Sequence, residues 1–401
     1  MIESIFEREL RKESLFTDKN KISPHYAPEE LPFREKEINE ISSLLAQALK
    51  NKKTDNLFIY GKTGSGKTVT VKHVTNKLVS FAEEKNALVE SIYINCRTHN
   101  SKYRVMLKLN QELYPNENFL GYSYAFVYES LLEYCNKTAK QLVVVLDEVD
   151  LVKDLDDLIY ALCRSNDELK NGGMSIIGIS NNVFFKERLD PRTKSSLCEK
   201  EMVFRPYNAR ELKEILKQRS KLAFKENTVQ ESALNCAAAI AAQESGDART
   251  AVMLLQRAGE IAEEKNLRKV GFDEVEQAKK KVEEEIIYSL INSLPEQQKL
   301  VLQAIAWLSS QKKGVQSFSV NPKTANALFS GEIYDTYCLQ AKELGVSSVS
   351  ARWFQEIINE LEMYGFITTM QSGKGFRGNT RLIRLGHDAN SILRAIKKEL
   401  N

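Results

Sequence analysis

The chain of 401 residues has few cysteines, and their arrangement builds neither a metal site nor a disulfide framework. Its six cysteines are scattered, and no two of them form a C-x-x-C pair. This spacing argues against a structural zinc site and against a disulfide-stapled secreted domain. The cysteines are therefore expected to be reduced thiols in the core or on the surface.

The sequence also lacks long apolar runs. Hydrophobic residues make up 42% of the chain, which is ample for packed cores. No stretch, however, approaches the roughly 18 to 20 apolar residues that a membrane-spanning helix needs. The first residues, Met1-Ile2-Glu3-Ser4, do not have the basic-then-apolar order of a signal peptide. We therefore expect a cytoplasmic protein of about two to four domains.

An excess of one charge sign is missing as well. Lys and Arg outnumber Asp and Glu only by 57 to 54, which gives a formal net charge of +3. The overall field of the protein is therefore no evidence for nucleic-acid binding, and such a hypothesis must rest on local patches. We find no internal repeat and no low-complexity linker, so the domains are expected to be joined tightly.

What the sequence does contain is a glycine-rich octapeptide, GKTGSGKT at 61–68, directly after the apolar run Leu57–Tyr60. It fits G-x-x-x-x-G-K-[ST] between a strand and a helix, which predicts a nucleoside triphosphate site. Glycines let backbone N–H groups approach the phosphates, Lys67 supplies a cation, and Thr68 offers a hydroxyl to Mg²⁺. The alternative is a glycine turn that only joins a strand to a helix. The predicted nucleotide-binding residues are Gly61, Lys62, Thr63, Gly64, Ser65, Gly66, Lys67, Thr68 and Val69.

A second apolar run, Leu142–Leu146, ends in Asp147 and Glu148. Downstream of the glycine-rich loop, this pattern predicts the other half of a phosphate-hydrolysing site. Asp147 would hold the Mg²⁺ shell, and Glu148 would orient or deprotonate the attacking water. Two acids at the end of a strand are otherwise a common surface feature. Asn181, which ends the next strand, would position the water or sense the γ-phosphate, and the alternative for it is an Asx turn.

The order of the elements predicts the fold class. Between 56 and 204, short β-rich runs alternate with helical stretches, as in a parallel sheet covered on both faces. After Pro206, helical spacing predicts an all-helical unit of roughly 85 residues. Pro295 ends that unit, and a third unit with three helices and a terminal β-hairpin follows. The expected strands are Leu57–Tyr60, Val89–Asn95, Leu142–Leu146, Ser175–Ser180 and Met202–Phe204. The expected helices of the second unit are Asn208–Phe224, Val229–Gln243, Asp247–Lys265 and Phe272–Leu290, with Asn208 and Asp247 as N-caps.

The third unit carries the pattern of a helix-turn-helix. An amphipathic helix, Ile333–Leu344, ends at Gly345, and Ser347 and Ser348 are expected to cap a second helix, Val349–Tyr364. The predicted buried stripe of the second helix is Trp353, Ile357, Leu361 and Tyr364. The polar positions expected to face outward, where a recognition helix meets the major groove of DNA, are Ser347, Ser348, Ser350, Arg352 and Gln355.

A predicted hairpin follows, with strands Ile367–Met370 and Thr380–Leu385 around a turn. No acidic residue occurs between Phe366 and Leu385, so this wing can neutralise phosphates or reach into a minor groove. The alternatives are a solvated charged face and a protein contact. The candidate DNA-binding residues of the wing are Lys374, Arg377, Arg381 and Arg384.

Together these motifs resemble an AAA+ ATPase of the initiator clade. More closely, they resemble the archaeal replication initiators related to the origin recognition complex and to cell division control protein 6. The likeness covers nearly the whole chain. Besides Gly61–Thr68, it is carried by Tyr26–Glu29 with Arg34, Val143–Asp150, Gly178–Asn182, Leu189–Arg192, Phe204–Tyr207 and Gly246–Arg249. The resemblance implies an ATPase base domain (1–205), a helical lid (206–290) and a winged-helix domain (291–401), with ATP or ADP and Mg²⁺ as cofactors.

The resemblance also implies residue roles. Arg249 is similar to the second sensor, an arginine that contacts the γ-phosphate and couples the nucleotide to the lid, a task suited to a guanidinium. The alternative is an ordinary exposed helix arginine. Tyr207 matches a contact near the base, and Arg219 matches a contact from the first lid helix. Arg192 resembles an arginine finger offered to a neighbouring subunit. The candidate catalytic residues are thus Lys67, Asp147, Glu148, Asn181, Arg192 and Arg249.

The segment Cys96–Lys140 between the second and third strands is too long for one crossover helix. Ser101–Leu113 and Tyr122–Thr138 both have helical patterns, so an extra helical element is expected. In the resembled clade, such an insertion is the initiator-specific motif, which contacts DNA, and Tyr122 and Tyr124 are candidate contacts. The alternative is that these aromatics pack the two helices together.

These observations lead to three hypotheses of function. The first is an ATP-dependent replication initiator that binds double-stranded origin DNA and helps to load the replicative helicase, with paralogous initiators and the helicase as partners. Such a protein would be associated with the nucleoid and hydrolyse ATP slowly, as a switch. The second is a nucleotide-switched transcription regulator with the same layout. The third is a DNA-binding scaffold with permanently bound ADP.

Overall fold

The computed structural model describes residues 14–182, 189–197, 199–311, 327–371 and 381–399. The chain forms two compact units, Met1–Ala278 and Lys279–Asn401. The division falls within the long helix α11 (Phe272–Ser293), and the three domain ranges taken from the family resemblance remain predictions. Within the described ranges, no helix combines the length and apolarity needed to cross a membrane.

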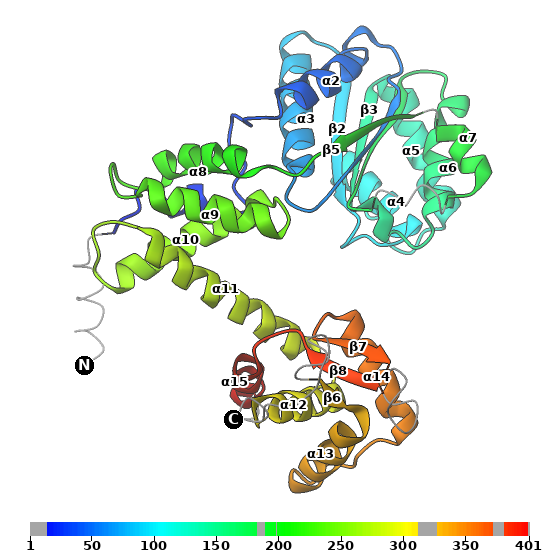
Figure 1. Ribbon diagram of the computed structural model, residues 1–401. Helices are drawn as coiled ribbons and strands as arrows, with labels where there is room; N and C mark the ends of the chain where they lie inside the picture. The colour runs from blue at the N-terminus through cyan, green and yellow to red at the C-terminus, as the bar shows by residue number, and fades with distance from the viewer. Residues whose placement is uncertain (1–13, 183–188, 198, 312–326, 372–380, 400–401) are drawn as a thin grey trace. The chain divides into compact units, whose positions relative to one another are not determined.

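Five parallel strands form the sheet of the first unit, in the order β2-β3-β4-β1-β5. Figure 1 labels β2, β3 and β5 of this sheet among the helices of the unit. The strands are β1 (Asn56–Gly61), β2 (Val89–Asn95), β3 (Gln141–Asp147), β4 (Gly173–Ser180) and β5 (Glu199–Phe204). β1, β3 and β4 are buried along their whole length, as expected for a parallel sheet with helices on both faces. The predicted α/β class and all five predicted strands are confirmed, although β5 begins at Glu199 rather than Met202. The carboxyl ends of the parallel strands lie at one edge of the sheet.

Side-chain alternation along β1 divides the interior into two cores. Leu57 and Ile59 pack with α2 and α3, whereas Phe58 and Tyr60 pack with α4, α5 and α6 on the other face. Successive side chains of a strand point to opposite faces, so one strand can serve both cores. The helices are α2 (Glu35–Leu45), α3 (Lys67–Glu84), α4 (Lys102–Leu113), α5 (Tyr124–Thr138) and α6 (Leu155–Glu168), and α7 (Pro191–Leu197) follows β4.

The insertion between β2 and β3 consists of two helices, α4 and α5, as predicted. Asn110, which is fully buried, links them because its Nδ2 donates to the carbonyl oxygens of Met106 on α4 and Val127 on α5, at 3.0 and 2.9 Å. The Tyr103 hydroxyl donates to the Tyr122 carbonyl at 3.1 Å and joins the start of α4 to the loop before α5. The insertion is therefore a packed hairpin of helices.

The next four helices after β5 are α8 (Ala209–Ala223), α9 (Glu231–Glu244), α10 (Ala248–Glu264) and α11 (Phe272–Ser293). We call α8 to α10 and the start of α11 the lid. Both predicted N-caps are confirmed, because the Asn208 side chain accepts from the Glu211 N–H in a capping box and Asp247 accepts from the Arg249 N–H. The N-terminal segment packs on this bundle, with the rings of Phe16 and Phe224 4.4 Å apart.

The second unit is built around one core, formed by the end of α11, four further helices and a small sheet. Its elements after α11 are α12 (Glu296–Gln311), β6 (Leu328–Phe329), α13 (Ser330–Glu343), α14 (Ala351–Met363), β7 (Ile367–Gln371), β8 (Arg381–Leu385) and α15 (Ala389–Glu399). The antiparallel sheet has the order β6-β8-β7. The predicted winged-helix class is confirmed, with α13 and α14 as the helix-turn-helix and β7 and β8 as the hairpin. The turn 372–380 lies outside the described residues.

Three details of the second unit correct the sequence predictions. The N-cap of α14 is Ser350, whose side chain accepts from the Trp353 N–H, rather than Ser347 or Ser348. Trp353 and Tyr364 are 60% and 45% exposed, because the buried stripe of α14 runs through Phe354, Ile357, Ile358 and Leu361. The hairpin is not terminal, since α15 follows it and packs Ile392 and Ile396 into the core.

Candidate nucleotide-binding and DNA-binding sites

The P-loop, residues 61–68, runs from the end of β1 into the start of α3 at the carboxyl edge of the sheet. Gly64 and Gly66 have φ angles of 70° and 90°, a region that side chains other than glycine rarely adopt. A Cβ on Gly64 would lie 1.5 Å from Oδ1 of Asp247, and one on Gly66 would lie 2.7 Å from the Tyr207 hydroxyl. The glycines therefore permit both the turn and the close approach of the lid.

Lys67 lies at the centre of the P-loop and is only 5% exposed. Its Nζ donates to the carbonyl oxygens of Gly61 and Lys62 at 2.8 and 2.9 Å and to Oδ1 of Asn181 at 2.9 Å. The structure thus brings together the predicted P-loop cation and the predicted sensor at the end of β4. Burial, with a contribution from Arg249, lowers the pKa of Lys67 to about 8.

This lowered pKa is expected to make the affinity of the predicted triphosphate site sensitive to pH. A bound triphosphate favours the charged ammonium, so binding is expected to take up a proton above pH 8. Affinity should fall as pH rises, by about threefold between pH 7.5 and 8.5. Calorimetry in buffers of different ionisation enthalpy measures both quantities. Lys67→Arg, whose guanidinium stays charged, is the control, and an affinity that is constant over this interval would contradict the expectation.

The two predicted metal-site residues also meet. The Thr68 hydroxyl donates to Oδ2 of Asp147 at 2.9 Å, and Tyr93 on β2 donates to the same oxygen at 2.7 Å. Burial and the nearby Asp147 carboxylate raise the pKa of Tyr93, so its hydroxyl remains a donor. The sequence analysis missed Tyr93, because only the pairing of β2 with β3, which sets Asn95 opposite Asp147, brings it to this site.

Glu148, the candidate base, is bound to an arginine that the sequence analysis also missed. Arg97 donates from Nε and Nη2 to the two carboxylate oxygens of Glu148, at 2.8 and 3.1 Å. The Arg97 side chain is 71% exposed, so solvent screens this pair. Glu148 has a φ of 54°, an uncommon value for a residue other than glycine and a feature often found at functional sites. The carboxylate would have to leave Arg97 to reach an attacking water.

The lid reaches the P-loop through the start of α10. The Ala248 N–H donates to the Gly64 carbonyl at 3.2 Å, directly beside the contact of Asp247 with Gly64. Arg249 is exposed, and it lies close enough for its charge to act on Lys67, while its role as second sensor remains a prediction. Tyr207, 7% exposed, packs against the P-loop at Gly66.

Arg219 and Arg192 lie elsewhere. Arg219 on α8 is 5% exposed, and its Nη2 donates to the Tyr26 carbonyl at 2.6 Å. Its guanidinium also lies 4.7 Å from the centre of the Tyr26 ring, so its described partners belong to the N-terminal segment rather than the P-loop. Arg192 is exposed in the first turn of α7, where its N–H donates to the Asp190 side chain. The roles given to both residues remain predictions.

The two candidate aromatics of the insertion differ in exposure. Tyr122 is 50% exposed and stacks on Phe126, with ring centres 4.6 Å apart. Tyr124 is partly buried beside Tyr128 and Lys102, and its buried hydroxyl has no hydrogen-bond partner among the described residues. Tyr122 is therefore accessible to a ligand, whereas the surroundings of Tyr124 match the packing alternative.

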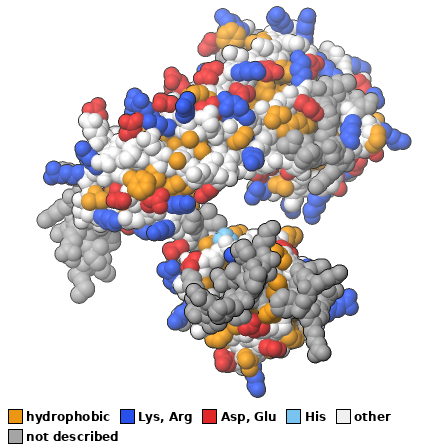
Figure 2. All heavy atoms as spheres, viewed as in Figure 1, with side chains coloured by type: hydrophobic (Ala, Val, Ile, Leu, Met, Phe, Trp, Pro, Cys, Tyr) orange, Lys and Arg blue, Asp and Glu red, His pale blue; other side chains and the backbone are white. Residues whose placement is uncertain are grey.

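The candidate DNA-contacting side chains of the second unit are accessible where they are described. Ser347, Ser348, Ser350 and Arg352 are exposed, and Gln355 is partly exposed. On β8, Arg384 is exposed and Arg381 is partly exposed. Lys374 and Arg377 lie outside the described residues. Figure 2 shows basic and acidic side chains interspersed on the face that it draws, so the described residues of that face form no large patch of one charge.

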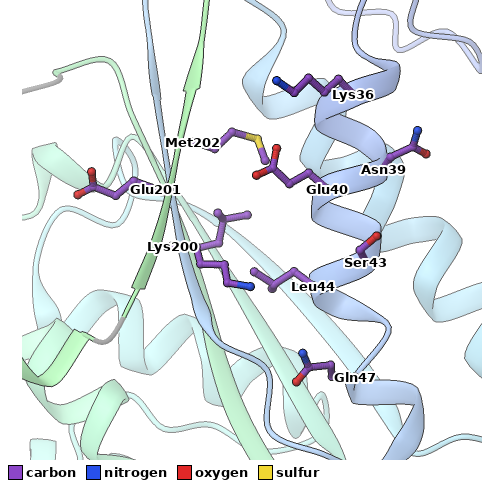
Figure 3. Close-up of a pocket in the computed structure, with 10 residues that line it drawn as sticks. Lys36, Asn39, Glu40, Ser43, Leu44, Gln47, Lys200, Glu201 and Met202 are labelled. Carbon is purple, nitrogen blue, oxygen red and sulfur yellow. The ribbon is translucent and has the colours of Figure 1, made fainter.

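One cavity of about 750 Å³ lies away from these residues, between α2 and the edge strand β5 (Figure 3). It is lined by charged and polar side chains together with the apolar side chains of Leu44, Leu57 and Met202. None of its lining residues belongs to the P-loop, to the end of β3 or to α10. The nucleotide site is therefore assigned from the converging side chains and not from this cavity.

The fold and the site define the class of protein, an AAA+ P-loop ATPase with a helical lid and a C-terminal winged helix. Family models agree: residues 50–182 match an AAA domain, 213–280 the Cdc6 AAA+ ATPase-type lid domain, and 289–395 the CDC6 C-terminal winged-helix domain. The chain belongs to the ORC1/Cdc6 family of DNA replication proteins.

Individual relatives support this assignment. The chain is 39% identical to ORC1-type DNA replication protein 1 of Sulfurisphaera tokodaii, over 97% of this chain and 95% of the relative. It is also 39% identical to the ORC1-type DNA replication protein of Thermococcus kodakarensis, over 96% and 91%. Its structure is similar to that of the Aeropyrum pernix ORC1 protein in complex with DNA. The TM-score is 0.80 and the identity 34%, and the match covers 96% of this chain and 97% of that chain.

Proposed function

We propose that this chain is an ATP-switched initiator of DNA replication that binds double-stranded origin DNA. The observation that carries the proposal is that four predicted site residues meet at the P-loop: Lys67 donates to Asn181, and Thr68 donates to Asp147. The same chain contains a winged helix. Membership in a family of DNA replication proteins supports it. The complex of the Aeropyrum pernix ORC1 protein with DNA supports DNA binding by this chain as well.

The site residues divide the work of binding and hydrolysis. P-loop N–H groups and Lys67 would hold the phosphates, while Asn181 and Arg249 would contact the γ-phosphate from two sides. Glu148 would accept the proton of the attacking water, because a carboxylate released from Arg97 is a base within the site. Slow turnover, suited to a switch, is part of this proposal, and the exposed pair with Arg97 contributes little to it.

Thr68 and Asp147 fit the coordination of Mg²⁺. This ion uses few protein oxygens and completes its shell with water and substrate phosphates, so one hydroxyl and one carboxylate suffice. When bound, it would neutralise charge on the β- and γ-phosphates. Tyr93 would keep the Asp147 carboxylate in position, because it donates to Oδ2 without competing as a base.

The DNA-binding surface would comprise α14, the β7–β8 hairpin and the insertion. Exposed Ser350 and Arg352 at the start of α14 suit the major groove, and Arg381 and Arg384 suit phosphates beside it. Tyr122 would add a contact from the insertion. We further propose that the protein helps to load the replicative helicase, acts with paralogous initiator subunits and is associated with the nucleoid. Arg192 would serve as an arginine finger toward a neighbouring subunit.

Genome-wide mapping of the DNA bound by the protein in cells tests this function. Enrichment at replication origins is the expected result. Binding at promoters without enrichment at origins would overturn the initiator proposal in favour of a transcription regulator. A variant with Lys67→Ala provides the control, because its pattern should change if the nucleotide controls DNA binding.

A further inference from the structure

We propose that Arg34 is a positioning residue that couples the P-loop to the hinge of the lid, the segment 205–208 between β5 and α8. The inference deepens the proposed function and rests on it, because it concerns how a bound nucleotide moves the lid. Arg34 lies at the N-cap of α2 and is 0% exposed. A fully buried arginine is uncommon and must have all its donors directed at partners.

The first partner of Arg34 is the outer side of the P-loop. Nε and Nη2 both donate to the Ser65 carbonyl oxygen, at 3.0 and 2.7 Å. That carbonyl belongs to the same rigid peptide plane as the Gly66 N–H. When the N–H of Gly66 turns toward a phosphate, the carbonyl held by Arg34 must turn with it. A change in the orientation of the Ser65–Gly66 peptide therefore moves the carbonyl oxygen to which Arg34 is hydrogen-bonded.

The second partner is the hinge. The same Nη2 donates to the Arg205 carbonyl at 2.7 Å, so one nitrogen joins the P-loop backbone to the hinge backbone. The guanidinium also lies 4.0 Å from the centre of the Tyr207 ring. A movement of the Ser65 peptide is thus transmitted to two hinge residues without passing through the sheet.

The hinge is in turn connected to the first lid helix. The Arg205 guanidinium forms a bidentate pair with Glu211, at 3.0 and 2.6 Å. Glu211 is the capping-box partner of Asn208 at the start of α8. The chain of contacts therefore runs from the P-loop through Arg34 and the hinge to the N-terminus of α8.

Only arginine can make this set of contacts. Its planar fork holds two carbonyls at a fixed separation, whereas a lysine ammonium is a single point on a flexible stem. The neighbouring Glu37 carboxylate, 3.2 Å from Nη1, balances the buried charge. Lysine at position 34 would keep the charge balance but could not join the Ser65 and Arg205 carbonyls. The Arg34→Lys variant therefore distinguishes coupling of the P-loop to the hinge from simple stabilisation of the fold.

Hydrogen exchange of Arg34→Lys, measured with and without a non-hydrolysable ATP analogue, tests the proposal. In the unchanged protein, the analogue is expected to slow exchange in both the P-loop peptide 61–68 and the hinge peptide 205–212, by about fivefold or more. In Arg34→Lys, the P-loop should remain protected, and protection of the hinge should fall below about twofold. Arg210→Lys, an exposed arginine of α8, makes the same chemical change as a control and should behave like the unchanged protein.

Each other outcome has a definite meaning. Full hinge protection in Arg34→Lys would overturn the proposal, and so would loss of P-loop protection in a folded variant, because Arg34 would then serve binding itself. If Arg34→Lys does not fold, Arg205→Ala tests the next link, since it keeps the carbonyl that Arg34 binds and removes the pair with Glu211. In Arg205→Ala, the analogue should no longer slow hydrogen exchange of the α8 amides, while protection elsewhere is unchanged. Slowed exchange in α8 of this variant would overturn the proposed coupling. Absence of P-loop protection in the unchanged protein would instead overturn the proposed nucleotide function.

Discussion

Replacing Glu148 by glutamine is expected to lower ATP turnover by about 10²- to 10⁴-fold, the usual contribution of a general base. Glutamine keeps the shape and one acceptor oxygen but cannot take a proton from water. ATP affinity should change little, because the phosphates are held by the P-loop and by Lys67 on the other side of the site. Single-turnover hydrolysis together with equilibrium nucleotide binding measures the two effects separately.

A matched control for this variant is Glu84→Gln, which makes the same charge change at the exposed end of α3. It should leave turnover unchanged. Equal turnover in Glu148→Gln and the unchanged protein would remove Glu148 from the chemistry. If both hydrolyse no ATP and ADP remains bound, the non-hydrolysing scaffold would be the better description of this chain.

The double change Arg381→Ala with Arg384→Ala is expected to weaken DNA binding and to flatten its dependence on salt. Each phosphate contact that is lost should reduce the slope of log affinity against log salt by about 0.9. Two contacts would therefore make the loss of affinity between 50 and 200 mM salt about tenfold smaller than in the unchanged protein. ATP binding should be unaffected, because both arginines lie in the second compact unit and the P-loop lies in the first.

The control for charge alone is Arg394→Ala with Lys397→Ala, which removes two cations from the exposed side of α15. Because Arg381 also donates to Asn359 on α14, thermal melting should confirm that the double variant at the hairpin folds. An unchanged affinity and an unchanged salt slope would remove the hairpin from the DNA surface.

The second unit shows where sequence patterns were ambiguous. Three serines before α14 satisfy the same capping preference, and only the path of the chain selects Ser350. The stripe through Trp353 and the stripe through Phe354 differ by one residue, about 100° around a helix, and both contain Ile357 and Leu361. Packing against α12 and α13 decides between them, and Trp353 consequently faces solvent.

The nucleotide site divides in the same way. The sequence indicated Lys67, Asp147, Glu148, Asn181 and Arg249 because they lie in motifs or at strand ends. Tyr93 and Arg97 have no such local signal, and Arg34, although it lies in a segment that carries the family resemblance, had no predicted role. Each of the three reaches the site from a different element. Arg97 follows β2 and Arg34 precedes α2, and strand order places them beside Glu148 and Ser65.

By itself, the sequence determined a P-loop unit with a parallel sheet, an all-helical unit and a winged helix, because periodicity, glycine spacing and strand-terminal acids are local properties of a chain. The family resemblance added that the helical unit is a lid. The tertiary structure alone decided that Arg97 binds Glu148, that Tyr93 supports Asp147 and that Arg34 joins the P-loop to the hinge. Those contacts depend on which strands are neighbours and which backbone carbonyls face a buried side chain. A linear pattern carries neither kind of information, because both arise only when the sheet and the lid have packed.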